Sequence, residues 1–177
     1  MFNLITLDGF FEGIGNDISW HNVDDEFNEF AHEQLNTADL LLFGRKTYEL
    51  MAGYWSSPDA LESDPITTKM MNQINKIVFS RTLQSADWEN TTLLKNAEDE
   101  VLKLKQIEGK NIFIFGSSDL AVNLAKKGLV DEYRIIINPL FLGKGKTLLQ
   151  GIENKINLTH INTRTFKNGN ILIYYKS

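Results

Sequence analysis

The sequence has no cysteine, and this absence excludes several kinds of site at once. A chain without thiols cannot form disulfides, a thiolate zinc site or a cysteine nucleophile. The lack of disulfides fits a reducing compartment, and we expect a cytoplasmic protein. Histidine is also scarce, and the three histidines have no spacing typical of metal ligands, so no metal site is predicted.

Long apolar runs and basic tracts are missing as well. The longest apolar runs, such as Ile135–Ile137, have the length of a strand and are too short to cross a bilayer. The first residues contain no positive segment, so no signal peptide is expected. The net charge is −5 and acids and bases are mixed, which leaves no basic arm. We therefore expect neither a membrane nor a nucleic acid as a partner.

The composition that remains is that of a globular domain. The 177 residues, 42% of them apolar and 23% charged, fit a single domain over residues 1–177. Short β-rich runs alternate with helical segments, which is typical of an α/β fold with a mostly parallel central sheet and helices on both faces. Eight strands are predicted, at residues 2–7, 40–43, 76–79, 91–94, 111–115, 132–138, 157–166 and 171–175.

Periodicity and turn chemistry predict the helices and the end of the sheet. Apolar faces indicate helices over residues 27–35, 66–74, 97–104 and 120–125, and a further helix begins near Arg45. The pair Asn168-Gly169 predicts an antiparallel hairpin between the last two strands, because both residue types tolerate positive φ.

The first candidate phosphate-binding turn follows the second predicted strand. Gly44 ends this strand, and Arg45, Lys46 and Thr47 begin a helix directly afterwards. Free backbone N–H groups at a helix start, the helix dipole and two cations together favour an anion. This combination suits the extra 2′-phosphate that separates NADPH from NADH. An ordinary turn with solvated basic residues is the alternative.

A second turn has the same plan, and its residues are Phe115, Gly116, Ser117 and Ser118. Gly116 permits close approach of a ligand to the backbone, and the two serines offer hydroxyl and amide donors to a pyrophosphate. A simple capping turn is the alternative. Because the carboxyl ends of parallel strands meet at one edge of a sheet, the two turns are expected to converge on one ligand.

A third strand ends in Ser80 and Arg81 at the same predicted edge. The guanidinium group suits a phosphate because it can donate two parallel hydrogen bonds. A solvated arginine at a strand end is the alternative.

The start of the chain supplies candidates for the substrate. A strand leaves the sheet at Asp8 and enters a glycine-containing loop with the aromatic residues Phe10, Phe11 and Trp20. Such a loop can close over a bound ring, and a carboxylate at the start of the first helix could orient a polar heterocycle. The substrate-binding candidates are Asp8, Phe10, Trp20 and Asp24, and the catalytic candidate is Asp25. In the alternative, Trp20 belongs to the core and both aspartates cap the helix; for Asp24 the cap is favoured.

Taken in chain order, these segments resemble the dihydrofolate-reductase-like superfamily. The resemblance is more specific to the reductase domain of the bifunctional riboflavin-biosynthesis deaminase/reductase and to its stand-alone bacterial relatives. The matching pieces are residues 6–10, 42–49, 76–81, 112–118 and 139–145. The resemblance implies a dihydrofolate-reductase-like domain that uses NADPH to reduce an electron-poor ring or imine. Related reductase domains commonly pair, so the resemblance also implies a homodimer, formed through the hairpin region.

The resemblance also implies roles for individual residues. The turn Gly44–Thr47 would hold the phosphates and the adenosine side of the cofactor, Ser80 and Arg81 the 2′-phosphate, and the turn Phe115–Ser118 the pyrophosphate. Asp25 is the positional match for the acidic residue that holds a pterin and supports its protonation, and Asp24 is the alternative. The chain departs from the family where Gly116-Ser117 replaces a pair of glycines, and it has no deaminase half.

Three functions remain open at this point. The first is an NADPH-dependent reductase of a small heterocycle that is pterin-like or pyrimidine-like, with or without a ribityl or ribosyl group. The second is a nucleotide- or pterin-binding domain without turnover. The third is a metal-dependent hydrolase that uses His21, His32 or His160. The segment from Gly143 to Lys146 also has two interpretations. It could bind a substrate phosphate, or it could be a loop with two solvated lysines.

Overall fold

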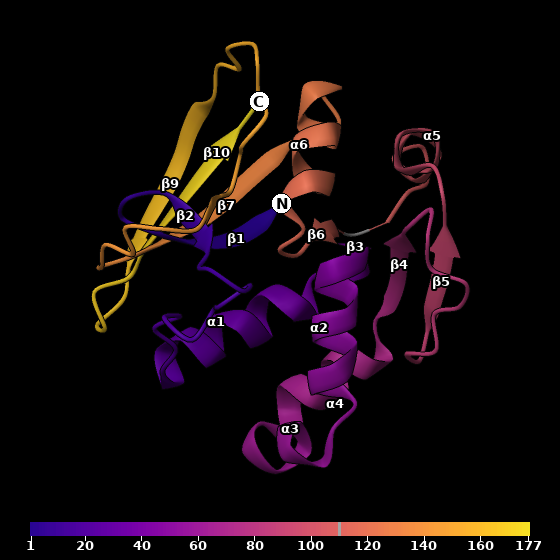
Figure 1. Ribbon diagram of the computed structural model, residues 1–177, viewed down its shortest axis with the longest axis horizontal. Helices are drawn as coiled ribbons and strands as arrows, with labels where there is room; N and C mark the ends of the chain where they lie inside the picture. The colour runs from indigo at the N-terminus through magenta and orange to yellow at the C-terminus, as the bar shows by residue number, and fades with distance from the viewer. Residues whose placement is uncertain (110) are drawn as a thin grey trace.

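A computed structural model describes residues 1–109 and 111–177, and within these ranges it contains ten strands and six helices. In chain order they are β1 (Phe2–Thr6), β2 (Phe10–Glu12), α1 (Asp25–Asn36), β3 (Ala38–Gly44), α2 (Arg45–Trp55), α3 (Pro58–Ser63), α4 (Pro65–Gln73), β4 (Asn75–Phe79), β5 (Thr91–Leu94), α5 (Ala97–Leu104), β6 (Asn111–Ile114), α6 (Ser118–Lys126), β7 (Glu132–Asn138), β8 (Lys146–Thr147), β9 (Thr159–Thr165) and β10 (Ile171–Lys176) (Figure 1).

The strands form two larger sheets and one small one. The first sheet has the order β5-β4-β3-β6, and all of its strands are parallel. In the second sheet, β1-β7-β10-β9, only β1 and β7 are parallel, and β10 runs antiparallel to both of its neighbours. The predicted hairpin is β9–β10, with Gly169 at a φ of 89° in its turn. Strands β2 and β8 pair as a separate ribbon.

The prediction of one eight-stranded sheet needs correction. All eight predicted strands are present, but β2 and β8 raise the number in the described ranges to ten. These two strands have three and two residues, too few to produce a recognisable alternation. Within the described ranges, one β-bridge links the two larger sheets, the pair Phe2–Phe115, because the end of β6 lies beside the beginning of β1. The amide of Gly116 donates to the carbonyl of Phe2 at this junction (3.3 Å).

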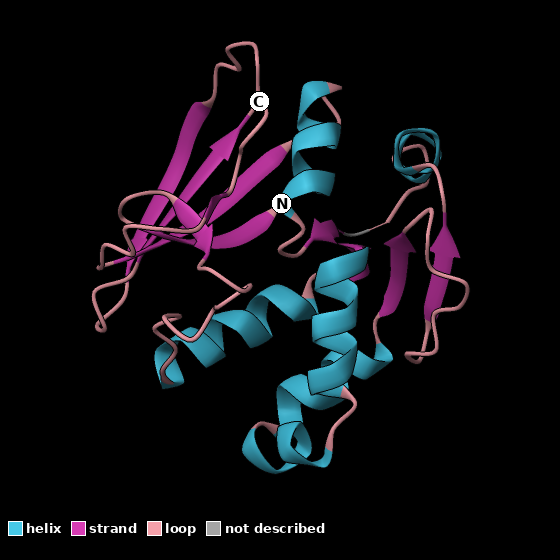
Figure 2. Ribbon diagram, viewed as in Figure 1, coloured by secondary structure: helices cyan, strands magenta, loops and turns pink. Residues whose placement is uncertain are grey.

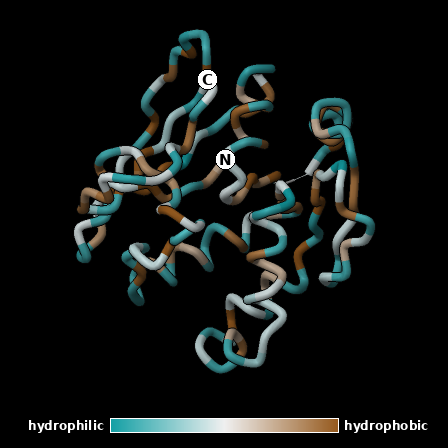
Figure 3. The backbone as a smooth tube through the Cα atoms, in the orientation of Figure 1, coloured by the Kyte–Doolittle hydropathy of each residue, from teal (hydrophilic) through white to brown (hydrophobic). Residues whose placement is uncertain are grey.

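Helices cover both faces of the strands, as predicted, and each face has its own core. Along β3, Leu41 and Phe43 face a core that includes Phe30 of α1, whereas Leu42 faces a second core that includes Leu124 of α6. Figure 2 shows α1 to α4 on one side of the strands and α5 and α6 on the other. In Figure 3 the hydrophobic segments gather in the central strands. None of the helices in the described ranges has the length and apolar content of a membrane span.

One charged side chain is buried inside this framework. Lys76 of β4 is 1% exposed. Its ammonium group donates to the carbonyls of Met71 (2.7 Å), Asn72 (3.1 Å) and Ile74 (2.6 Å), and lies 4.6 Å from the ring centroid of Trp88. The last carbonyls of α4 therefore have a buried cation as their partner, which is favourable at the negative end of a helix.

We expect Lys76→Met to lower the free energy of unfolding by about 3 kcal/mol, because three carbonyls lose their donor. Denaturant unfolding measures this change. Lys69→Met, on the exposed side of α4, is the matched control and should change stability by no more than about 0.5 kcal/mol. Equal effects of the two substitutions would show that the buried ammonium contributes nothing.

Candidate functional site

A cavity of about 640 Å³ opens at the carboxyl ends of the strands of the parallel sheet. Its walls come from residues 44–47 after β3, 79–81 at the end of β4, 95–98 after β5 and 117–120 after β6. One side of α6 and residues of β2 and β8 complete it. This is the edge where open α/β sheets bind their ligands, because the turns that follow parallel strands converge there.

Three helices begin at this cavity, and two of them, α2 and α6, differ from the other helices in their N-terminal caps. Side chains cap four helices: Asp24 accepts from Phe27 N for α1, Ser57 from Ala60 N for α3, Asp64 from Thr67 N for α4 and Asn96 from Asp99 N for α5. Helices α2 and α6 have no side-chain cap. The first-turn N–H groups of α2 and α6 are therefore left for a ligand, and the dipoles of both helices favour an anion.

The charge of the cavity is opposite to that of the whole chain. The basic side chains that line it are Arg45, Lys46, Arg81, Lys95, Lys126, Lys127 and Lys146, and the acidic ones are Glu12, Glu98 and Asp119. The chain as a whole has a net charge of −5. An excess of positive charge in a concave site attracts anions and raises their local concentration.

Four of these seven cations already have carboxylate partners. The pairs are Arg45 with Glu49, Lys126 with Glu153, Lys127 with Glu98 and Lys146 with Asp119. Lys46, Arg81 and Lys95 form no ion pair with any residue of the described ranges, and all three are exposed. These three side chains can therefore turn toward a bound anion without breaking an existing contact.

The structure brings most of the predicted cofactor residues together at this cavity. Those that line it are Gly44, Arg45, Lys46, Thr47, Ser80, Arg81, Ser117 and Ser118. Phe115 and Gly116 belong to the same turn but do not line the cavity. The hydroxyl of Ser80 accepts hydrogen bonds from the amides of Thr82 (3.1 Å) and Leu83 (3.0 Å), so it also shapes the turn after β4. The roles of the predicted cofactor residues in binding a cofactor stay predictions.

Several lining residues were missed. Lys95 follows β5 as Arg81 follows β4, and this shared position at a strand end could have identified it. Lys126 and Lys127 lie near the end of α6, and no local pattern connects them to a turn nine residues earlier. In β2 it is Phe11 and Glu12, and not Phe10, that line the cavity, and the pairing of β2 with β8 is irregular between Phe10 and Glu12.

Asp8, a predicted substrate residue, makes its contacts inside the protein. It accepts hydrogen bonds from the hydroxyl of Thr6 (2.5 Å) and from the amides of Leu142 (3.1 Å) and Gly143 (2.8 Å). Burial acts to raise the pKa of this carboxyl, but these hydrogen bonds outweigh it and lower the pKa of Asp8 below its usual value. The carboxylate thus fixes residues 142 and 143 beside the end of β1, and it does not line the cavity.

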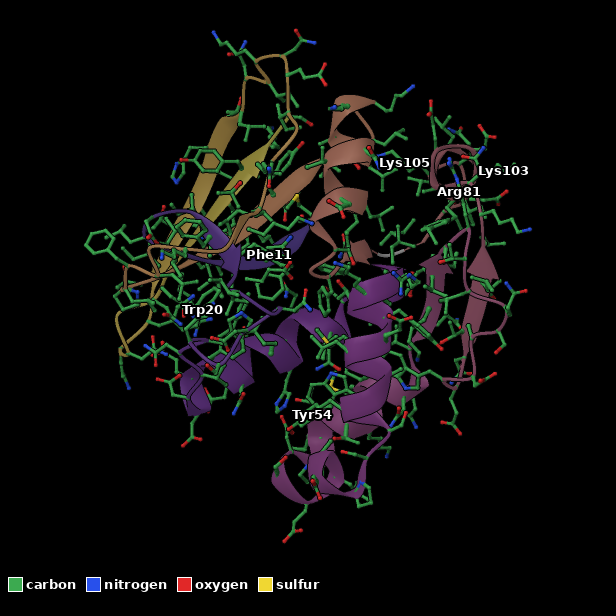
Figure 4. All side chains as sticks on the ribbon, in the orientation of Figure 1. Phe11, Trp20, Tyr54, Arg81, Lys103 and Lys105 are labelled. Carbon is green, nitrogen blue, oxygen red and sulfur yellow. The ribbon has the colours of Figure 1, made fainter. Side chains whose placement is uncertain are left out.

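Phe10, Trp20, Asp24 and Asp25 also lie outside this cavity. The Trp20 indole donates to the carbonyl of Asp17 (3.1 Å) and packs against the first core. The favoured interpretation of Asp24 as a helix cap is confirmed, since it accepts from Phe27 N at 2.9 Å. Asp25 is the exposed first residue of α1. Figure 4 shows Trp20 with the loop before α1, and Arg81 beside α5. Substrate and catalytic roles for this loop stay predictions.

The three histidines lie in separate surroundings. Nε2 of His32 is 2.9 Å from the hydroxyl of Thr67, and Nε2 of His160 is 2.8 Å from that of Thr163. Burial lowers the pKa of His21 to about 4, against a smaller opposite effect of a nearby aspartate, so this ring is neutral at neutral pH. Within residues 1–109 and 111–177, no group of three or more histidine and carboxylate side chains could hold a metal ion.

Comparison with known proteins identifies relatives along nearly the whole chain. The family model described as the RibD C-terminal domain matches residues 1–172. The protein YyaP of Bacillus subtilis strain 168 is 36% identical over 173 residues, which cover 97% of this chain and 90% of YyaP.

Solved structures share the fold. A protein from Shewanella sp. PV-4 that is named for riboflavin biosynthesis matches with a TM-score of 0.74 and 21% identity, over 99% of this chain and 96% of that one. The Thermotoga maritima diaminohydroxyphosphoribosylaminopyrimidine deaminase/5-amino-6-(5-phosphoribosylamino)uracil reductase matches with a TM-score of 0.69 and 15% identity. This chain is covered to 99% there and spans 55% of the Thermotoga chain, which also includes a deaminase by its name.

Gly116 offers a test of how closely the turn before α6 packs against Thr47 of the cavity wall. Its φ is +56°, and a Cβ at this position would lie 2.9 Å from Cγ2 of Thr47. We expect Gly116→Ala to lower the free energy of unfolding by about 2–3 kcal/mol, from backbone strain and the clash together. Adding Thr47→Ser removes Cγ2 but keeps the hydroxyl, and should restore about half of the loss. Denaturant unfolding measures both changes.

The control for this series is Gly128→Ala. Gly128 has a φ of +66°, but a Cβ there would meet no atom within 4 Å. We expect a loss of about 1 kcal/mol, which is the strain of the backbone alone. A double variant no more stable than Gly116→Ala would contradict the proposed clash.

Proposed function

The chain belongs to the RibD C-terminal domain family, and on this basis we propose that it is an NADPH-dependent reductase that transfers a hydride to a small heterocyclic substrate. The observation that carries the proposal is the cavity at the carboxyl edge of the parallel sheet. Two uncapped helix N-termini face it, together with three cations that have no ion-pair partner in the described part of the chain. These groups suit a ligand with several phosphates at separate positions. A dinucleotide of the NADPH type is such a ligand, because it has a pyrophosphate and a 2′-phosphate.

The preference for NADPH over NADH rests on Arg81 and Lys95. Phe79 and Leu94 are paired in the parallel ladder, and Arg81 and Lys95 follow within two residues of them. Both cations therefore leave neighbouring strands at the same edge, and both line the cavity. Together they could pair with the 2′-phosphate, which NADH lacks.

When bound, NADPH would supply the hydride, and the protein would supply orientation and electrostatics. Phe11 and Phe79 are the aromatic residues of the cavity wall, and the Cζ of Phe11 lies 3.7 Å from a Cβ built at Gly116. Phe11 therefore offers an aromatic face in the cavity wall, against which a flat heterocycle could pack. A pterin-like or pyrimidine-like substrate, with or without a ribityl or ribosyl group, is the class we propose.

A nucleotide- or pterin-binding domain without turnover is the second candidate. One observation favours it: Asp25, the residue proposed to support protonation, is exposed and does not line the cavity. Binding of the cofactor without hydride transfer to any substrate would distinguish this candidate from the reductase.

The test is a titration with NADPH and NADH, followed by energy transfer from tryptophan to the nicotinamide. We expect NADPH to bind more tightly than NADH. The double variant Arg81→Ala/Lys95→Ala should raise the Kd for NADPH at least about tenfold and the Kd for NADH no more than about twofold, because only NADPH loses charge-assisted contacts. The effect should shrink as the salt concentration rises.

Lys103→Ala is the matched control, since Lys103 is an exposed lysine of α5 that pairs with Glu100 outside the cavity. It should leave both affinities unchanged. Absence of binding of either nucleotide at high concentration would contradict the proposal. Once binding is found, loss of nicotinamide absorbance with dihydrofolate or ribosylaminopyrimidine substrates tests turnover and separates the two candidates.

We also propose that the protein pairs with a second copy of itself through the hairpin. Strand β9 is the last strand of its sheet and has only β10 as a neighbour in the described ranges. It is exposed along nearly its whole length. An exposed strand edge is a template for pairing with another chain, and Ile161, which is 47% exposed, adds apolar surface.

Light scattering after gel filtration tests this proposal. We expect a mass of twice the 20.2 kDa of one chain, and a shift toward the single-chain mass for Ile161→Lys. Leu61→Lys, at a similarly exposed apolar residue of α3, should leave the mass unchanged. A single-chain mass for the unsubstituted protein would refute the pairing.

A further inference from the structure

Ser117 has an unusual conformation for its residue type. It is the N-cap residue of α6 and lies in the left-handed region, with φ 57° and ψ 53°. Residues with a side chain rarely adopt this conformation, and glycine adopts it without strain. The side chain at this position is 6% exposed and therefore belongs to the protein interior.

The side chain of Ser117 connects the two strand-to-helix turns of the cavity. Its hydroxyl accepts a hydrogen bond from the amide of Gly44 at the start of α2 (2.9 Å) and donates to the carbonyl of Phe115 (3.1 Å). Its own amide donates to the hydroxyl of Thr47 in the first turn of α2 (3.0 Å). Three hydrogen bonds thus centre on one residue, and two of them join α2 to the turn before α6.

This arrangement leaves Ser117 without a donor for a ligand. Its hydroxyl proton is directed to Phe115 and its amide proton to Thr47. The amide of Gly44 is used as well. The backbone donors left for a phosphate at these two turns are therefore the first-turn amides that follow in α2 and α6, and the relative position of those two sets of amides depends on Ser117.

We propose that Ser117 is a positioning residue, which fixes the spacing of the α2 and α6 N-termini so that one diphosphate group can contact both. The inference rests on the proposed function, because it assigns a diphosphate-bearing ligand to the same cavity. The inference goes beyond the proposed function in the role that it gives to Ser117. In this role Ser117 acts through Gly44 and Thr47 and not by contact with the ligand. A single phosphate is too small to need both helix ends, so its affinity depends less on their spacing.

The experiment compares Ser117→Gly and Ser117→Ala with the unsubstituted protein. Inorganic pyrophosphate and inorganic phosphate are titrated by calorimetry, and Tm is measured for each protein. Glycine relieves the left-handed backbone and should leave Tm within about two degrees of the original. We expect both variants to bind pyrophosphate at least about fivefold more weakly, and phosphate with less than about a twofold change.

Two further measurements separate positioning from stability. Thr68→Val removes another buried hydrogen bond, from the Thr68 hydroxyl to the carbonyl of Ala60 (2.9 Å), on helices outside the cavity. It should lower Tm but leave pyrophosphate affinity unchanged. Amide hydrogen exchange without ligand should be faster at Gly44 in both Ser117 variants, because its acceptor is gone.

The outcomes distinguish failure of the proposed Ser117 role from failure of the proposed function. Weaker pyrophosphate binding by a Ser117→Gly variant of unchanged Tm supports the positioning role. Unchanged pyrophosphate affinity in this variant overturns that role and leaves the proposed cofactor site intact. If the unsubstituted protein binds neither pyrophosphate nor NADPH, the proposed function fails, and the inference fails with it.

Discussion

The hydrogen bond from the amide of Gly44 to the hydroxyl of Ser117 joins two elements that are far apart in the chain. Gly44 ends β3 and Ser117 precedes α6, so this bond connects two strand-to-helix turns at one edge of the parallel sheet. Because both turns are held there, the uncapped starts of α2 and α6 open on one cavity. The close approach of Thr47 to Gly116 belongs to the same contact and leaves no room for a larger residue.

The offset between the two sheets decides what lies near this cavity. Since β6 and β1 share a single pair among the residues that the structure describes, Phe2–Phe115, the end of β1 lies about one strand length beyond the end of β6. The loop that follows β1 therefore begins away from the cavity. At the start of this loop, Asp8 holds residues 142 and 143. Strand β2 returns toward the cavity and brings Phe11 into its wall.

The charges of the molecule are divided between the cavity and the remaining surface. Seven basic side chains and three acidic ones line the cavity, although the chain is acidic as a whole. Four of the cations form ion pairs, and three are exposed and have no carboxylate partner among the described residues. An acidic surface around a basic cavity directs anionic ligands to that cavity and away from other sites.

The sequence by itself determined the eight longer strands, the terminal hairpin, the cap at Asp24 and the family, because apolar runs, an Asn-Gly turn and a short capping motif are local signals. It also located both strand-to-helix turns that contribute to the cavity wall, since each is contiguous in the chain. Only the tertiary structure decided that the strands form two sheets, that Lys126 reaches the same cavity as Arg81, and that the donors of Ser117 are used within the protein. Apart from the bond between Ser117 and Phe115, these features depend on contacts between residues tens of positions apart, and no local pattern records such contacts.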